Sequence, residues 1–152
     1  MTGPGPGEQG RADAPQVAVG AVAVHDGHLL LVRRGTAPEA GRWSIPGGRV
    51  GAGESLAAAV EREVREETGL AVRCGSLVGV AERMGPGHHF VILDFAVELP
   101  GSEGALPPPV AGDDAAECAW TGLDAVEGMD LVEGLAGFLR RHGVLGPDTR
   151  SG

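Results

Sequence analysis

The sequence predicts an α/β fold, and three observations support this class. Short runs of β-branched and apolar residues recur along the chain, as is typical of strands. Two longer segments, 55–68 and 130–142, are rich in helix-forming residues instead, and a glycine follows each of them. The length of 152 residues, with 42% hydrophobic and 22% charged residues, is that of one globular domain with its own core.

The first elements are predicted to be strands. Residues 17–24 and 29–34 are apolar runs separated by four residues that contain an Asp-Gly pair, which hairpin turns favour. These two runs are therefore expected to form a hairpin. After a polar loop, residues 42–48 are expected to form a short strand that Pro46 and two glycines interrupt.

The middle of the chain holds the clearest helix signal. Residues 55–68 contain good helix formers throughout, and Gly69 stands where a C-terminal cap belongs. Two strand candidates follow, 70–84 and 88–99, with Gly-Pro-Gly between them as a turn. We expect this pair to be antiparallel.

The last part of the domain is predicted to contain one more strand and one more helix. Residues 100–112 are rich in proline and glycine and are expected to be a flexible loop. Residues 117–123 then form a short strand, and residues 130–142 a helix that ends at Gly143.

The two ends of the chain differ from the middle. Residues 1–16 are rich in glycine, proline and charge, so they are expected to be a disordered tail, followed by the domain at 17–143 and a short tail at 144–152. No stretch has the pattern of a signal peptide or a membrane span, which predicts a cytoplasmic protein without a membrane partner. Cys74 and Cys118 have no metal or disulfide pattern and are expected to be reduced.

The charge balance restricts the partners. Twelve basic residues, all arginine, against 21 acidic residues give a net charge of −9, which argues against binding a nucleic-acid polymer. An anionic substrate would need a bridging cation. The chain contains no lysine, asparagine or tyrosine, whose codons are AT-rich, and this indicates a GC-rich, bacterial genome.

The helix at 55–68 carries an acidic cluster. Glu63, Glu66 and Glu67 are three and four residues apart and fall within an arc of about 100°. Val60 and Val64 border this face, so the repelling carboxylates are expected to be shielded from water. Mg²⁺ or Mn²⁺ would relieve such a cluster. The alternative is a solvated face stabilised by ordinary i,i+4 ion pairs between glutamate and arginine.

The spacing around these carboxylates resembles the Nudix box of Nudix hydrolases. The box is matched by Gly48, Glu54, Arg62-Glu63-Val64, Glu66-Glu67 and Gly69-Leu70, which are nine specified positions over 23 residues. The resemblance extends from Val17 to about Arg141. It implies a Nudix fold, an α/β/α sandwich around a mixed sheet, and a hydrolase that acts on phosphorus-containing acid anhydrides with Mg²⁺ or Mn²⁺.

The resemblance also implies roles for single residues. The metal ligands are expected to be Glu63, Glu66 and Glu67, together with the main-chain carbonyl of Gly47. Arg62 and Glu54 are expected to orient these carboxylates.

The general base is left open. Glu67 is one candidate, and the loop before the last strand offers Glu117, Asp113 and Asp114. We favour Glu117 within that loop, although a solvated loop carboxylate is an equal interpretation.

Four residues are candidates for substrate binding. Arg34, which ends an early strand, and Arg49 are expected to contact phosphate, and strand alternation allows only one of Arg33 and Arg34 to point into the site. Trp43 is the first candidate for stacking on a base, with core packing as the alternative. Pro86 follows Leu70 by sixteen residues, a spacing associated with ADP-ribose pyrophosphatases of the family, although turn geometry explains it as well.

The favoured substrate is an ADP-ribose-like nucleoside diphosphate derivative, with AMP and ribose 5-phosphate as products. The alternative is a MutT-type enzyme that releases pyrophosphate from nucleoside triphosphates, including oxidised ones. The absence of asparagine counts against one mode of reading oxidised guanine. A third interpretation is a nucleotide sensor without catalysis, but the intact box argues against it. The sequence leaves a homodimer open.

Overall fold

The computed structural model describes residues 14–112 and 115–146. In chain order the elements are β1 (Gln16–Val22), β2 (Val24–His25), β3 (His28–Arg34), β4 (Trp43–Ser44), β5 (Gly47–Arg49), α2 (Leu56–Thr68), β6 (Arg73–Gly85), β7 (His88–Glu98), β8 (Ala115–Gly122), the 3₁₀ helix η1 (Val126–Gly128) and α3 (Leu135–Arg141).

The larger sheet is mixed and has the strand order β5-β1-β7-β6. β1 pairs antiparallel with β5 but parallel with β7, and β7 pairs antiparallel with β6. The predicted β6–β7 hairpin is confirmed, and its turn contains Gly87 at a φ of 79°, a backbone conformation that glycine adopts without strain. The sheet therefore has the mixed character expected of the fold.

A second, antiparallel sheet contains β2, β3, β4 and β8. β2 and β4 pair with the two ends of β3, and β8 pairs along its whole length, from His28 opposite Gly122 to Arg34 opposite Ala115. A register shift lies between Arg33 and Arg34. This second sheet was not predicted.

The expected hairpin of 17–24 with 29–34 is only partly right. Antiparallel pairing is limited to Val24 opposite Leu29 and His25 opposite His28, around a turn in which Asp26 and Gly27 have φ of 49° and 73°. The long first strand does not pair with β3, because its partners are β5 and β7 in the other sheet. The chain passes from one sheet to the other at Ala23.

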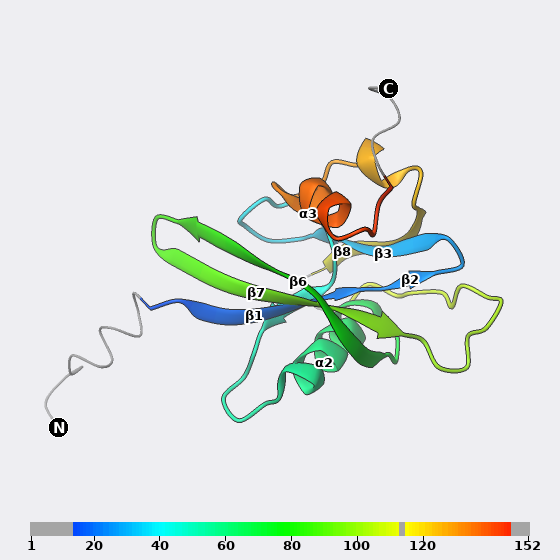
Figure 1. The fold of residues 1–152 in the computed structure, drawn as a ribbon, viewed down its shortest axis with the longest axis horizontal. Coiled ribbons are helices and arrows are strands. Elements are labelled where there is room, and N and C mark those ends of the chain that lie inside the picture. The colour runs from blue at the N-terminus through cyan, green and yellow to red at the C-terminus, as the bar shows by residue number, and fades with distance from the viewer. Residues whose placement is uncertain (1–13, 113–114, 147–152) are drawn as a thin grey trace, which may run out of the picture.

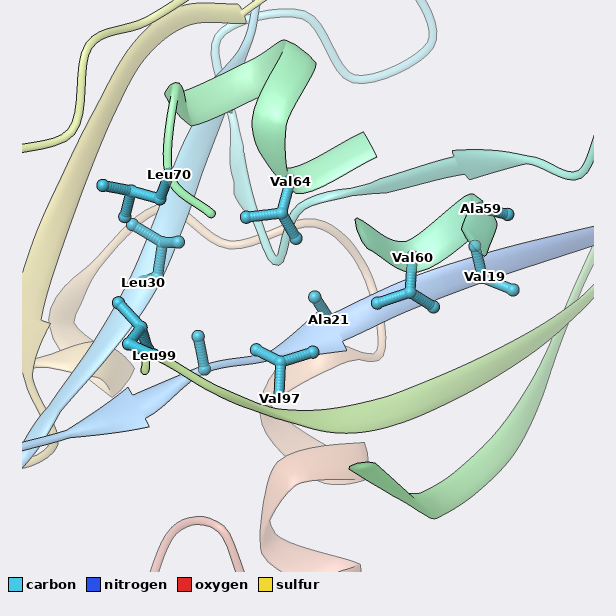
Figure 2. Packing of buried hydrophobic residues seen from close by; sticks show 10 residues of the cluster. Val19, Ala21, Leu30, Ala59, Val60, Val64, Leu70, Val97 and Leu99 are labelled. Atoms are coloured by element: carbon cyan, nitrogen blue, oxygen red, sulfur yellow. The ribbon is translucent and has the colours of Figure 1, made fainter. Parts of the chain in front are cut away.

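Helices α2 and α3 lie on opposite sides of the strands (Figure 1). Ten residues, including Leu30, form a core cluster between α2 and the strands, and nine of them are labelled in Figure 2. A second cluster contains Leu29, Leu31 and the apolar residues of α3. The strands bury both faces, which explains their continuous apolar runs and confirms the expected α/β/α sandwich.

The last helix is shorter than predicted. The structure begins α3 at Leu135 instead of residue 130, after Gly134, whose φ is 85°. Residues just before it extend the sheet instead, since Leu131 bridges to Trp43 and the Trp43 carbonyl accepts the Val132 N–H. In the part of the chain that the structure describes, no helix is both long and apolar enough to cross a membrane.

Candidate active site on helix α2

Local chemistry explains why α2 begins and ends where it does. The Ser55 hydroxyl accepts a hydrogen bond from the Ala58 N–H at 3.1 Å, which caps the first turn. Gly69 closes the helix in the left-handed conformation, and its N–H donates to the Arg65 carbonyl. Val60 and Val64 are buried against the sheet, so the carboxylates next to them lie at the border of the core, as predicted.

Arg62 gathers the acidic residues of this region around one guanidinium. Its Nε and Nη2 donate to Oε2 and Oε1 of Glu54 at 2.6 and 2.9 Å. Its Nη1 donates to Glu63 at 2.7 Å and to Glu66 at 3.2 Å, and its Nη2 also reaches the carbonyl of Arg49. The hydrogen bonds to Glu54 and Glu63 raise the pKa of Arg62 further above its ordinary value. The five donors of one arginine thus hold three carboxylates and the end of β5 in place.

Glu54 connects this cluster to the loop before the helix. One of its oxygens also accepts the Gly51 N–H at 2.9 Å. The hydrogen bonds from Arg62 lower the pKa of Glu54 to about 2, and the Gly51 N–H contributes in the same direction. Glu54 is therefore ionised at neutral pH and fixes one side of the Arg62 guanidinium.

Glu67 is held differently from the other carboxylates of the helix. Its Oε1 accepts the Gly47 N–H at 2.9 Å. Burial raises the pKa of Glu67 to about 8, because the nearby Glu63 carboxylate adds to this effect while the Gly47 N–H and Arg34 only partly oppose it. A carboxylate with this pKa can take up a proton near neutral pH.

A glycine at the start of the box makes room for Glu63. A Cβ on Gly48 would lie only 2.5 Å from Oε1 of Glu63, so a larger residue here would displace the carboxylate. The side chain of Glu63 is 15% exposed, compared with 43% for Glu66. The cluster therefore runs from a shielded end at Glu67 and Glu63 to an open end at Glu66.

The donor set suits a hard divalent cation in kind. Glu63 and Glu66 both contact the same nitrogen of Arg62, and Glu67 lies near enough to Glu63 for repulsion to affect its pKa. Carboxylate oxygens are the ligands that Mg²⁺ and Mn²⁺ prefer. Within residues 14–112 and 115–146, however, no three acidic, histidine or cysteine side chains are grouped so that they could hold a metal ion as they stand. Arg62 and Gly47 engage these oxygens instead.

The two arginines at the end of β3 have different surroundings. Arg34 donates from Nε to the carbonyl of Pro38 at 2.7 Å, and its charge lowers the pKa of Glu67. Arg33 instead donates to Glu117 through Nε and Nη2, at 3.2 and 3.0 Å. Of the two, Arg34 is thus the one close to the box, in line with the expectation that only one of them faces the site.

Glu117 lies opposite Arg33 in the β3–β8 pairing. On β3, Leu30 packs into the cluster under α2, whereas Leu31 packs into the cluster under α3. Strand alternation puts Arg33 and its partner Glu117 on the α3 side. The other loop candidates for the base, Asp113 and Asp114, lie outside the described residues.

The remaining substrate candidates are spread over the molecule. Arg49 is exposed at the end of β5, where its side chain donates to Gln16 at 3.3 Å. Trp43 is half-buried and packs against the core cluster under α3. Pro86 is exposed in the turn of the β6–β7 hairpin. The Arg49 carbonyl accepts a hydrogen bond from Arg62 at 3.1 Å, so the backbone of Arg49 adjoins the box. The side chains of Arg49, Trp43 and Pro86 make no hydrogen bond or ion pair with the box carboxylates among the described residues, and their roles stay predictions.

Two acidic residues of note were missed by sequence reasoning. Glu39 bonds to Arg42, to Arg83 and to the N–H of Glu133, and thereby ties the β3–β4 loop to β6 and to the segment before α3. Asp94 is buried in the middle of β7. Only Asp94 had a sequence signal, as a charged residue in the middle of an apolar strand.

A known protein family matches the part of the chain that contains this site. The model for the NUDIX domain matches residues 14–142. A protein from Methanocaldococcus jannaschii named ADP-ribose pyrophosphatase is 37% identical over 112 residues, which are 72% of this chain and 63% of that protein. The chain therefore spans less than two thirds of the length of this relative.

Two further similarities cover more of each chain. A Mycobacterium tuberculosis protein provisionally named 8-oxo-dGTP diphosphatase 2 is 33% identical over 129 residues, or 82% of this chain and 85% of that protein. The crystal structure of a MutT protein from Methanosarcina mazei superimposes with a TM-score of 0.74 at 28% identity, covering 87% of this chain and 96% of that one.

Proposed function

The chain belongs to the Nudix hydrolase family, and we propose that it cleaves the diphosphate bond of a nucleoside diphosphate linked to a second group. An ADP-ribose-like compound is the favoured substrate, with AMP and ribose 5-phosphate as products. The observation that carries the proposal is the Arg62 guanidinium bonded to Glu54, Glu63 and Glu66 beside the partly protonatable Glu67.

The carboxylates of α2 are proposed to hold Mg²⁺ or Mn²⁺. Glu63, Glu66 and Glu67 would supply side-chain oxygens, and the carbonyl of Gly47 a main-chain oxygen. When bound, the cation neutralises the diphosphate oxygens and lowers the pKa of a coordinated water. Arg62 holds the Glu63 and Glu66 carboxylates beside each other through its Nη1, and Glu54 keeps Arg62 in place.

Glu67 is the better supported of the two candidates for the general base. Burial raises the pKa of Glu67 in the absence of a cation, and a bound cation would lower it again, so that Glu67 would be ionised beside the coordinated water. The Gly47 N–H holds Oε1 of Glu67 at 2.9 Å and so fixes where this carboxylate lies. Glu117 remains the rival, but its carboxylate is engaged by Arg33.

Arg34 is proposed to contact a phosphate of the substrate. The Pro38 carbonyl accepts a hydrogen bond from its Nε, and its other guanidinium nitrogens make no hydrogen bond or ion pair with the described residues. The charge of Arg34 lowers the pKa of Glu67. A substrate phosphate bound between Arg34 and Glu67 would therefore be attracted to the Arg34 guanidinium. Arg49, Trp43 and Pro86 are retained as weaker candidates for substrate contacts.

The rival substrate class is a nucleoside triphosphate, including oxidised dNTPs, cleaved to a monophosphate and pyrophosphate. The M. tuberculosis relative favours this class, because the similarity to this chain extends over 85% of its length. The ADP-ribose pyrophosphatase relative has a higher sequence identity, but the similarity extends over only 63% of its length. A sensor that binds without cleaving is the third interpretation. The complete set of box carboxylates argues for turnover.

The partners and location are also proposals. We infer a small-molecule substrate and neither a nucleic-acid polymer nor a membrane, because the net charge of −9 repels polyanionic surfaces. A cytoplasmic location and a domain spanning residues 17–143 complete the proposal.

The test is a product assay with Mg²⁺ and with Mn²⁺ on ADP-ribose, a dinucleoside polyphosphate, the common triphosphates and 8-oxo-dGTP. We expect AMP and ribose 5-phosphate from ADP-ribose as the best-supported products. Pyrophosphate release from a triphosphate at a higher kcat/KM would move the assignment to the rival class. Tight nucleotide binding without turnover of any compound would favour the sensor.

A further inference from the structure

Glu39 lies in the loop between β3 and β4, outside the proposed catalytic machinery. Its side chain is 16% exposed, whereas the other residues of 35–41 are exposed to water. Within 35–41, Glu39 is the only residue whose side chain forms a hydrogen bond or an ion pair with any described residue. Because apolar packing contributes little here, the Glu39 carboxylate is the main side-chain attachment of residues 35–41 to the rest of the fold.

Both oxygens of the Glu39 carboxylate accept hydrogen bonds. Oε1 accepts from the Arg42 guanidinium and from the Glu133 N–H, both at 2.9 Å, and Oε2 accepts from Nη2 of Arg83. Arg83 belongs to β6 of the larger sheet, and Glu133 to the segment before α3. Glu39 thus fixes a loop of the smaller sheet to two separate parts of the fold.

The backbone of Glu39 depends on this anchoring. Its φ of 59° lies in the left-handed region, which residues other than glycine adopt rarely and at a cost in free energy. Such a conformation persists only where surrounding contacts hold it. The contacts of the Glu39 carboxylate do so, and they therefore determine the path of the chain at Pro38, the residue before it.

The same loop fixes Arg34, the proposed phosphate contact. The carbonyl of Pro38 accepts a hydrogen bond from Arg34 Nε at 2.7 Å. The backbone closes the base of the loop, since the Arg34 N–H donates to the Arg42 carbonyl and the Gly41 N–H to the Arg34 carbonyl, both at 2.8 Å. A chain of contacts therefore leads from the Glu39 carboxylate to the Arg34 guanidinium.

We propose that Glu39 is a positioning residue, which holds the Pro38 carbonyl in place so that the Arg34 guanidinium is oriented toward the diphosphate before the substrate binds. This inference rests on the proposed function, in which Arg34 contacts a phosphate. An arginine that is already ordered loses less conformational entropy on binding than a mobile one. Glu39 has no hydrogen bond or ion pair with the box carboxylates among the described residues, so its effect passes through Arg34.

The first test measures kcat and KM for ADP-ribose and for 8-oxo-dGTP. Glu39→Gln keeps the size of the side chain but removes its charge, so Arg34 must become ordered when the phosphate binds. For each compound that is hydrolysed we expect KM to rise about fivefold to tenfold, with kcat within about threefold of wild type. Glu127→Gln is the matched control, because the Glu127 side chain is 22% exposed and also pairs with an arginine, Arg140 of α3. It should leave KM unchanged.

A double-mutant cycle separates positioning from a general loss of stability. Arg34→Ala removes the phosphate contact, so adding Glu39→Gln to it should change KM by less than about twofold. An equal rise in KM with and without Arg34 would overturn the inference, and so would an unchanged KM in Glu39→Gln alone. Arg83→Gln removes the partner of Glu39 on β6 and should raise KM in the same direction. It replaces Glu39→Gln in the cycle if that variant does not fold.

A measurement without ligand keeps the test independent of hydrolysis. The Nε–H group of Arg34 gives its own NMR signal, which Arg34→Ala identifies by its loss, and the heteronuclear NOE of this signal reports the mobility of the side chain. Arg34 should be rigid in the wild-type and Glu127→Gln proteins and mobile in Glu39→Gln. A rigid Arg34 in Glu39→Gln would overturn the inference while hydrolysis of a diphosphate still supported the proposed function. Failure of the wild-type chain to hydrolyse any compound would count against the proposed function, and the NOE would still decide whether Glu39 positions Arg34.

Discussion

Arg62 binds both oxygens of Glu54, with its Nε 2.6 Å from Oε2 and its Nη2 2.9 Å from Oε1. This two-point contact fixes the plane of the guanidinium, and the remaining nitrogen then meets Glu63 and Glu66. The ion pair between Glu54, in the loop before α2, and Arg62 thus determines where the carboxylates of Glu63 and Glu66 lie. Arginine does this because its donors form a rigid fork, which lysine lacks.

We therefore expect Arg62→Lys to impair the alignment of the proposed metal ligands. The variant should need about 10- to 100-fold more Mg²⁺ for half-maximal activity, since residues that orient metal ligands have effects of this size. The measurement is a Mg²⁺ titration of hydrolysis. Arg140→Lys is the matched control, because Arg140 makes an exposed ion pair with Glu127 on the α3 side. An unchanged Mg²⁺ dependence for Arg62→Lys would show that the fork is not needed.

Glu66→Gln tests the carboxylate at the open end of the cluster. The substitution removes one charge but no buried packing, since 43% of the Glu66 side chain is exposed. We expect the fold to persist and kcat/KM to fall by at least about a hundredfold. Glu61→Gln on the same helix is the control, because its amide oxygen can still accept the Cys74 N–H. Near-normal activity at saturating Mg²⁺ would remove Glu66 from the ligand set.

The identity of the general base can be decided by comparing the variants Glu67→Gln and Glu117→Gln. If Glu67 takes the proton of the attacking water, Glu67→Gln should lower kcat by about 10²- to 10⁴-fold. Glu117→Gln should leave kcat within about threefold, because the exposed pair with Arg33 contributes little. The measurement is the pH profile of kcat at saturating Mg²⁺. A large loss in Glu117→Gln with unchanged metal affinity would assign the base to the loop.

The parts of the structure that were predicted correctly depend on local chemistry. Ser55 and Gly69 cap α2 at the residues where their side-chain and backbone preferences belong, and the spacing of its glutamates alone brought them to one face. The β6–β7 hairpin likewise follows from Gly-Pro-Gly, which specifies a turn between neighbouring strands. Interactions within a few residues need no knowledge of the rest of the chain.

The features that were missed depend on contacts between distant residues. The first strand was assigned to its neighbour β3, but Val19 pairs with Leu93 and Gly48, which are far away in sequence. The bond between Glu39 and Arg83 joins segments 44 residues apart, and the pairing of Asp94 with Gly20 joins two strands that only the fold brings together. Sequence periodicity predicts that a strand exists, but burial of both faces leaves its partner unspecified.

Asp94 should make stability depend on pH in a defined direction. Its pKa is raised by burial from an ordinary 3.8 to about 6, so the folded state binds this proton more tightly than the unfolded state does. The stabilising effect is present below pH 4 and is lost as the pH rises through 6. We expect Asp94→Asn to be more stable than wild type by about 1 kcal/mol at pH 8. At pH 4 this stability difference should be smaller. Urea unfolding at both pH values measures this, and equal differences at the two pH values would contradict it.

Glu39 should have the opposite pH dependence. Burial alone would raise the pKa of Glu39, but the hydrogen bonds from Arg83, the Glu133 N–H and Arg42 outweigh it and lower the pKa to about 2. A depressed pKa stabilises the fold above the ordinary value of 4.5, and the effect is lost as the pH falls toward 2. Glu39→Gln should therefore destabilise the protein by about 1 kcal/mol at pH 7, a value discounted for screening by solvent. Thermal unfolding at pH 7 and pH 3 measures this difference, which should shrink at the lower pH.

Glu98→Gln, whose side chain is 74% exposed, is the control and should change the Tm little at either pH. A Glu39→Gln protein with the wild-type Tm at pH 7 would mean that the β3–β4 loop is held in place without this carboxylate.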